Sequence, residues 1–356
     1  MLRKVVGCMT GTSMDGLDVC LMQIDGHGFE MKVKILAHGS FGLEAFREQF
    51  QKISNSQVIE LSSYLQTALD FGSFHATSIS SVIKKQKVDL ICVHGQTLYH
   101  KPPLSLQLMN PYPIASKLEV PVVYDLRGMD LACGGEGAPI TPIADQILYQ
   151  IKQPTAILNF GGFSNYTFIQ SKDSKLVVLG GDICACNLFL NQLSKILFNK
   201  PFDEDGRFAL KGNLNLTLYH FVVNILSAQA ERKKSLGTND DGINEILNRA
   251  TKIPPEDVLR TVCSAIAEVI SQKINFAEMI IVAGGGSNNR CLMVELANKC
   301  KGKIKASQEL GVPAEVREAA CFAILGALSQ DKIPITIPSI TGGKHSFVSG
   351  SWVYPN

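Results

Sequence analysis

The chain has 356 residues, of which 46% are hydrophobic and 19% are charged, and its formal net charge is +2. This is the composition of an ordinary globular protein, and it excludes the disordered and fibrous classes. A nearly neutral charge without a long run of Lys or Arg argues against a nucleic-acid or membrane partner. The length predicts two domains.

The cellular setting follows from what the sequence lacks. The basic start of the chain has no apolar stretch long enough for a secretory signal. No apolar run reaches the roughly 18 residues that a membrane-spanning helix needs. The ten cysteines are scattered, without a Cys-x-x-Cys pair. We therefore expect a reduced, cytoplasmic protein.

The first 24 residues predict a strand, a tight polar turn and a returning strand. Backbone N–H groups and hydroxyls in such a turn can approach phosphate oxygens. The candidate phosphate-binding residues are Gly11, Thr12, Ser13, Met14, Asp15, Gly16, Leu17 and Asp18. Asp15 and Asp18 could also hold Mg²⁺ through water molecules. The alternative is a plain hairpin, because Gly, Ser and Asp are common turn formers.

A short apolar run at 88–93 is typical of a buried parallel strand. It ends at His94-Gly95-Gln96, and polar groups at the carboxyl ends of such strands commonly face a ligand. His94 and Gln96 could donate hydrogen bonds to sugar hydroxyls. The alternative is a histidine whose hydrogen bonds are satisfied inside the protein.

A second apolar run, 120–124, leads to Asp125-Leu126-Arg127. The planar guanidinium of Arg127 suits a carboxylate or a phosphate. The alternative is an internal ion pair of Arg127 with Asp125 or Asp130.

The strand–turn–strand pattern recurs at 156–169, with Gly161 and Gly162 in the turn. This second hairpin could hold phosphates from another side, although it too could be a plain hairpin. A third strand at 176–179 is followed by Asp182, whose carboxylate we expect at a strand end and choose as the candidate base. Its alternative role is a helix N-cap, which Asp favours.

The strand at 279–283 precedes Gly284, Gly285 and Gly286. Bare backbone there could accept a flat ligand such as an adenosine, or could instead mark a close helix–strand crossing. The segment lacks the third glycine of a dinucleotide fingerprint and the Gly-Lys-Ser/Thr of a Walker loop. Helices are predicted to begin at 254 and 313. Glu318 lies on the second, where a solvated surface residue is the usual reading.

Taken together, the order and number of these motifs resemble the anhydro-N-acetylmuramic acid kinase family over nearly the whole chain. The segments that carry the resemblance, besides those above, are Gly134-Gly135-Glu136-Gly137-Ala138-Pro139, Asp203-Glu204-Asp205-Gly206 and Thr341-Gly342-Gly343. The resemblance implies an α/β, two-domain actin/hexokinase-like (ribonuclease H-like) fold with a nucleotide cleft between the domains. We place residues 1–125 and about 330–356 in domain I, and residues 126–329 in domain II.

The resemblance also implies an activity that uses ATP and Mg²⁺. The 1,6-anhydro bond of 1,6-anhydro-N-acetylmuramic acid is hydrolysed while O6 is phosphorylated, giving N-acetylmuramic acid 6-phosphate and ADP in peptidoglycan recycling and amino sugar catabolism. Asp182 matches the general base, the first hairpin matches the phosphate loop, and Arg127 and Glu318 match residues near the sugar.

The segment after Asp182 departs from the family pattern, and so does Glu136, which stands where Gln is usual. Asp182 is followed by Ile183-Cys184-Ala185-Cys186-Asn187, where Cys-Gly-Pro-Gly-Asn is usual. Two alternatives therefore stay open: a kinase of a related sugar, and a non-catalytic sugar or nucleotide sensor of the same fold. The expected partners are the anhydro-sugar and ATP, and a homodimer is left open.

Overall fold

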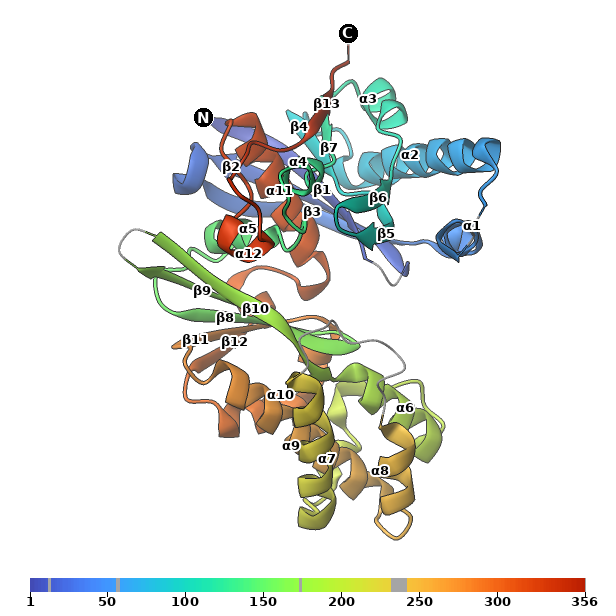
Figure 1. Ribbon diagram of the computed structural model, residues 1–356, viewed down its shortest axis with the longest axis vertical. Helices are drawn as coiled ribbons and strands as arrows, with labels where there is room; N and C mark the ends of the chain where they lie inside the picture. Colours follow the sequence, from blue (N-terminus) through green and yellow to red (C-terminus); the bar gives the residue numbers. More distant parts are fainter. Residues whose placement is uncertain (12–13, 56–57, 173–174, 232–241, 356) are drawn as a thin grey trace. The chain divides into compact units, whose positions relative to one another are not determined.

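The computed structural model describes residues 1–11, 14–55, 58–172, 175–231 and 242–355 (Figure 1). Contacts divide the chain into two compact units. The first unit comprises Met1–Gln150 and Glu315–Asn356, and the second comprises Ile151–Ala314. Each unit is an α/β structure with its own sheet, which confirms the predicted α/β class.

The boundaries between the units differ from those expected at 125/126 and 329/330. Residues 126–150 and 315–329 belong to the first unit. The physical reason is helix packing, because α5 (Thr141–Leu148) lies against α11 (Arg317–Gln330), and α11 lies against β1 (Leu2–Thr10).

The first unit is built on a six-stranded sheet. Its strands, in spatial order, are β13 (Ser351–Val353), β7 (Val122–Tyr124), β4 (Leu90–Val93), β1, β2 (Gly16–Asp25) and β3 (Lys32–Gly42). The strands β1, β4 and β7 are parallel, whereas β1, β2 and β3 are antiparallel. The predicted first hairpin is therefore β1–β2, and the two apolar runs are β4 and β7. The remaining elements are α1 (Glu44–Asn55), α2 (Leu61–Ile83), α3 (Tyr112–Leu118), α4 (Gly128–Ala132), α12 (Pro338–Thr341), and the ribbon β5 (Gln96–Lys101) and β6 (Leu104–Leu108).

The side chains of β1 alternate between the two faces of the sheet. A helix packs against β1 on each of these faces. Val6 and Cys8 share a buried cluster with Phe71 of α2. Gly7 between them faces α11, and a Cβ there would come within 2.0 Å of the Ala319 carbonyl oxygen. Only a glycine lets α11 approach β1 this closely, so this residue helps to position Glu318.

The second unit has a five-stranded sheet. Its strands, in spatial order, are β10 (Lys175–Ala185), β9 (Phe163–Lys172), β8 (Thr155–Phe160), β11 (Met279–Ala283) and β12 (Lys303–Ala306). Within this unit the helices lie on one face of the sheet (Figure 1): α6 (Asn187–Phe198), α7 (Leu216–Ala230), α8 (Ile243–Arg249), α9 (Pro255–Ile274) and α10 (Arg290–Lys299). The helix predicted to begin at 254 is α9, and its apolar stripe from Val258 to Ile270 is buried in this core.

No helix in the described ranges is both long enough and apolar enough to cross a membrane.

Candidate functional site

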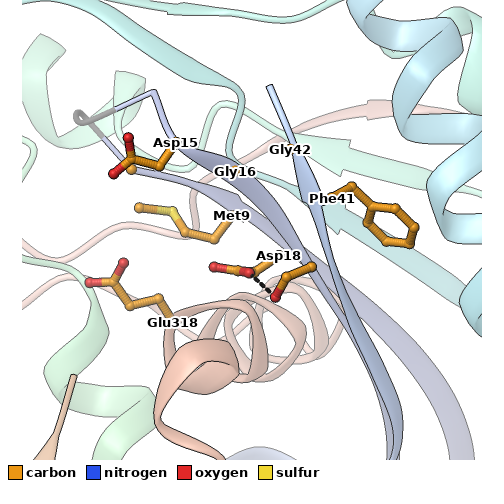
Figure 2. Close-up of a pocket in the computed structure, with 9 residues that line it drawn as sticks. Met9, Asp15, Gly16, Asp18, Phe41, Gly42 and Glu318 are labelled. Carbon is orange, nitrogen blue, oxygen red and sulfur yellow. Dashed lines mark hydrogen bonds between the residues drawn. The ribbon is translucent and has the colours of Figure 1, made fainter. Parts of the chain in front are cut away.

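The first hairpin contributes to a pocket in the first unit (Figure 2). The pocket has a volume of about 420 Å³ and is lined by Met9, Gly11, Asp15, Gly16, Asp18, Ser40, Phe41, Gly42 and Glu318. Strand pairing explains part of this set, because Asp18 on β2 lies directly opposite Ser40 on β3. Glu318 comes from the first turn of α11.

The structure places the predicted residues of this hairpin differently. Gly11, Asp15, Gly16 and Asp18 line the pocket, and the Met14 N–H donates to the Gly11 carbonyl at 3.2 Å. Leu17 is fully buried in the core, so its side chain does not line the pocket, and its part in phosphate binding stays a prediction. Thr12 and Ser13 lie outside the described residues.

The pKa of the Asp18 carboxylate in this pocket is raised above its ordinary value. Burial raises its pKa, the hydrogen bond from Ser40 Oγ at 2.5 Å lowers it, and the charges of Glu318 and Glu315 raise it. The net shift is upward, since desolvation disfavours the charged form. Asp15 is exposed and lies 3.4 Å from Arg47 Nη2. Ser40 was missed by the sequence reasoning, because only strand pairing places it beside Asp18.

Asp15 and Asp18 are the residues expected to hold Mg²⁺. Among the described residues no group of three or more His, Cys, Asp or Glu side chains could hold a metal ion. Mg²⁺, however, commonly keeps several waters and needs only one or two carboxylates. Asp15 and Asp18, both lining the pocket, fit that requirement.

Arg127 is held by two neutral acceptors. Its Nε donates to His94 Nε2 at 2.8 Å, and its Nη1 donates to the Gly137 carbonyl at 2.7 Å. The alternative, an ion pair of Arg127 with Asp125 or Asp130, does not form. Asp125 accepts from the Gly128 N–H instead, at 3.0 Å.

The buried Asp130 organises the loop that carries Gly137. Its Oδ2 accepts from the Gly137 N–H at 2.8 Å, and its Oδ1 accepts from Thr341 Oγ1 at 2.8 Å. The Glu136 N–H in turn donates to the Thr341 carbonyl at 2.6 Å. Two neighbouring motif segments and the distant Thr341 therefore meet around one carboxylate, which orients the Gly137 carbonyl towards Arg127.

His94 and Gln96 are both engaged within the protein. His94 is buried, with Nδ1 2.8 Å from the Gly95 carbonyl, and its second ring nitrogen accepts from Arg127. Gln96 Nε2 donates to the Gly11 carbonyl at 3.0 Å and to the Thr97 carbonyl at 3.2 Å. The expected donation to sugar hydroxyls therefore has no free donor on His94. The alternative of a satisfied histidine describes it better.

The start of α11 is fixed by a buried ion pair beside Glu318. Arg317 Nε donates to Asp145 Oδ1 at 3.0 Å, and Arg317 Nη2 lies 2.5 Å from Asp145 Oδ2. Glu318 itself is exposed. A bidentate pair of this kind has little rotational freedom, so it holds the first turn of α11 against α5.

In the second unit, the turn of the second hairpin is bound to the start of α6. The Gly162 carbonyl accepts from the N–H groups of Cys186 and Leu188 at 2.8 and 3.0 Å, and the Gly161 carbonyl accepts from the Asn187 N–H at 3.1 Å. Asn187 Nδ2 also donates to the Phe160 carbonyl at 2.9 Å. Sequence reasoning did not select Asn187, although the family motif contains it.

The three glycines after β11 lie against the same turn. Gly284 has φ +83°, and a Cβ there would come within 2.4 Å of Asn159 Oδ1. A Cβ on Gly286 would come within 2.7 Å of Phe160 Cβ, whereas one on Gly285 would meet no atom within 4 Å. The glycine loop and the hairpin turn thus form one surface of the second unit, with open space at Gly285.

Asp182 lies on β10 near a bulge, where the register shifts between Asp182 and Cys184. Its side chain is exposed. The N-cap residue of α6 is Cys186, so the alternative N-cap role of Asp182 is wrong. The residues that follow, Ile183 to Cys186, are fully buried, and burial raises the pKa of Cys184 to about 12. The segment that departs from the family pattern therefore packs in the core.

Several known proteins are similar to this chain. A family model described as anhydro-N-acetylmuramic acid kinase matches residues 3–355. Proteins so named from Bacillus thuringiensis subsp. konkukian (strain 97-27) and Bacillus cereus (strain AH187) are 32% and 31% identical to this chain, and each match covers 99% of both chains. Xylulose kinase from Rhodospirillum rubrum has a TM-score of 0.47 at 12% identity, covering 99% of this chain and 94% of that one. Component A of (R)-2-hydroxyglutaryl-CoA dehydratase from Acidaminococcus fermentans has a TM-score of 0.49 at 13% identity, covering 91% and 98%.

Proposed function

The chain belongs to the anhydro-N-acetylmuramic acid kinase family, and from this premise we propose how its residues carry out the reaction. The substrates are 1,6-anhydro-N-acetylmuramic acid and ATP, and the products are N-acetylmuramic acid 6-phosphate and ADP. The observation that carries the assignment is the family match over residues 3–355. We also propose that the enzyme works in the cytoplasm, where ATP is available.

The proposed reaction couples a hydrolysis to a phosphoryl transfer. Asp182 takes a proton from a water molecule while the water oxygen bonds to the anomeric carbon. The bond between that carbon and O6 breaks, and its electron pair stays on O6. O6 then attacks the γ-phosphorus, and ADP leaves. A carboxylate base is needed because water is a weak nucleophile at an acetal carbon. The exposed position of Asp182 on β10 supports this role.

We propose that the hairpin β1–β2 and the turn at Gly161 and Gly162 bind the ATP phosphates, and that Gly284 to Gly286 bind the adenosine. The open space at Gly285 supports the second assignment. Mg²⁺ would be held through waters by Asp15 and Asp18 and would neutralise charge on the phosphoryl oxygens. Ser40 would orient Asp18 through the hydrogen bond to Oδ1.

We propose that Arg127 and Glu318 act on the sugar. Glu318 lines the pocket of the first unit, and burial lowers the pKa of Arg127 while the charge interaction with Glu318 opposes that shift. Gln96 stabilises the conformation of the β1–β2 turn, because its side chain donates to the Gly11 carbonyl.

An ADP-release assay with and without the anhydro-sugar tests this function. We expect Mg²⁺-dependent ADP release only when sugar is present, and a sugar product heavier by one water and one phosphoryl group by mass spectrometry. A product that carries phosphate without added water would contradict the coupled mechanism. Sugar binding without any ADP release would favour a sensor, and preference for another sugar would favour a related kinase.

A further inference from the structure

The contacts around Arg127 point to a residue whose role goes beyond the proposed catalytic set. A guanidinium inside a protein is commonly neutralised by a carboxylate, which also fixes its geometry. Here the two acceptors of Arg127, the imidazole of His94 and the carbonyl of Gly137, carry no charge. Arg127 is only half-buried.

The two aspartates beside Arg127 in sequence are engaged elsewhere. Asp125 accepts from the Gly128 N–H, and Asp130 accepts from Gly137 and Thr341. No ion pair of Arg127 occurs within the described residues, and Glu318 acts on it only through longer-range charge. The positive charge of Arg127 therefore stays available for a ligand.

The Arg127 side chain also keeps free donors. Nε and one N–H of Nη1 are used by His94 and Gly137, whereas Nη2 donates to no acceptor in the part of the chain that the structure describes. Two N–H groups in one plane with a fixed direction suit the two oxygens of a carboxylate or phosphate.

His94 is well placed to fix that direction. Its ring is buried, packs 4.9 Å from the ring of Phe322, and is held on the Nδ1 side by the Gly95 carbonyl. Because a carbonyl can only accept, the ring proton lies on Nδ1, and Nε2 is left as an acceptor for Arg127. Burial and the charge of Arg127 lower the pKa of His94 to about 3, so the ring stays neutral at physiological pH.

We propose that His94 is a positioning residue that holds the Arg127 fork by a neutral hydrogen bond, leaving its charge and its Nη2 donors to bind an oxyanion of the substrates. The inference rests on the proposed function. The oxyanion is either the lactyl carboxylate of the anhydro-sugar or a phosphate of ATP, and the two sources separate in the experiment below.

Two matched variants test the positioning role. In His94→Asn the side-chain amide can keep the bond to the Gly95 carbonyl but cannot reach Arg127. In His94→Gln the amide oxygen can take the place of Nε2 and accept from Arg127. His75→Asn is the control for buried-histidine packing, because His75 is also buried, bonds a carbonyl through Nδ1 and packs against a phenylalanine.

Calorimetric binding is the readout, since it does not require turnover. The probes are 1,6-anhydro-N-acetylmuramic acid, 1,6-anhydro-N-acetylglucosamine, which lacks the lactyl carboxylate, and a non-hydrolysable ATP analogue. If the fork binds the sugar carboxylate, His94→Asn weakens binding of the acid about tenfold to a hundredfold, the scale of a hydrogen bond to a charged group. The same variant leaves the neutral sugar and the nucleotide unchanged, and His94→Gln recovers most of the loss.

The other outcomes are equally decisive. Weaker nucleotide binding with unchanged sugar binding would support the fork and assign it to a phosphate. Equal loss for all three probes, or the same loss in His75→Asn, would overturn the positioning role in favour of a packing effect. Unchanged binding of every probe by His94→Asn would also overturn it. Failure of the proposed function would show separately, as wild-type protein that binds these probes without releasing ADP.

Discussion

At the residue scale, the exposed Asp182 differs from Asp130 and Asp145, two buried aspartates of the first unit that hold its structure together. Asp130 and Asp145 are buried, and their carboxylate oxygens accept hydrogen bonds from donors within the protein. Asp182 is exposed, lies on a strand beside a bulge, and does not cap α6. An exposed carboxylate at the end of a strand is accessible to a substrate, which is what the proposed general base requires.

Replacing Asp182 by Asn is the corresponding prediction. We expect kcat to fall by about 10²–10⁴-fold, the usual contribution of a general base, while the KM values for ATP and sugar move little. The thermal unfolding midpoint should stay near that of the wild type, because no helix cap is lost. Steady-state kinetics on protein shown to be folded by circular dichroism measures this. Wild-type turnover by the Asn variant would rule out the base.

At the element scale, the glycine loop after β11 and the turn of the second hairpin depend on each other. Gly284 has a positive φ and no room for a Cβ beside Asn159, whereas a Cβ on Gly285 would meet no atom within 4 Å. A glycine is therefore required at 284 by the fold itself, whereas at 285 it is required only if a ligand occupies the space beside it.

The matched variants Gly284→Ala and Gly285→Ala test this separation. An alanine at Gly284 is strained at φ +83° and collides with Asn159, so we expect a loss of stability of about 1–3 kcal/mol together with weaker ATP binding. An alanine at Gly285 should leave stability unchanged but raise the KM for ATP, because a methyl group fills space that the adenosine needs. Urea unfolding and ATP titrations read out the two effects. A Gly285→Ala protein with unchanged KM would place the adenosine elsewhere.

At the scale of the whole molecule, buried histidines couple stability to pH. His75 on α2 is fully buried, and desolvation lowers its pKa to about 4, although its hydrogen bond to the Phe71 carbonyl partly opposes this shift. The unfolded chain binds a proton on this residue near pH 6.5, whereas the folded chain does not until about pH 4. The contribution of His75 to the free energy of unfolding is therefore fully present above pH 6.5 and decreases as the pH falls towards 4.

The size of this effect can be estimated and measured. A depression of this size corresponds to about 3 kcal/mol of stability lost from His75 across the window. We expect His75→Gln to flatten the pH dependence of the urea midpoint between pH 7 and 4, although it lowers stability at pH 7. His345→Gln, at an exposed position, is the control and should keep the wild-type slope. An unchanged slope in His75→Gln would contradict the assignment.

Much of the architecture could be read locally. The hairpins β1–β2 and β8–β9 follow from apolar runs on either side of small polar turns, and the buried parallel strands β4 and β11 follow from short continuous apolar runs. These patterns depend on neighbours within a few residues, where propensity and periodicity act. The family resemblance then supplied roles for residues such as Asp182 and Arg127.

Partners far apart in sequence could not be read in this way. Nothing in the residues around His94 indicates that Arg127, 33 positions away, takes its second ring nitrogen, or that Thr341 bonds Asp130 across 211 positions. The same holds for Ser40 opposite Asp18, and for the packing of α11 that moves the unit boundary to residue 315. The sequence by itself determined the local elements and the family, because both reside in contiguous segments. Only the tertiary structure decided which polar groups are already satisfied, since desolvation and hydrogen-bond geometry exist only once distant segments pack together.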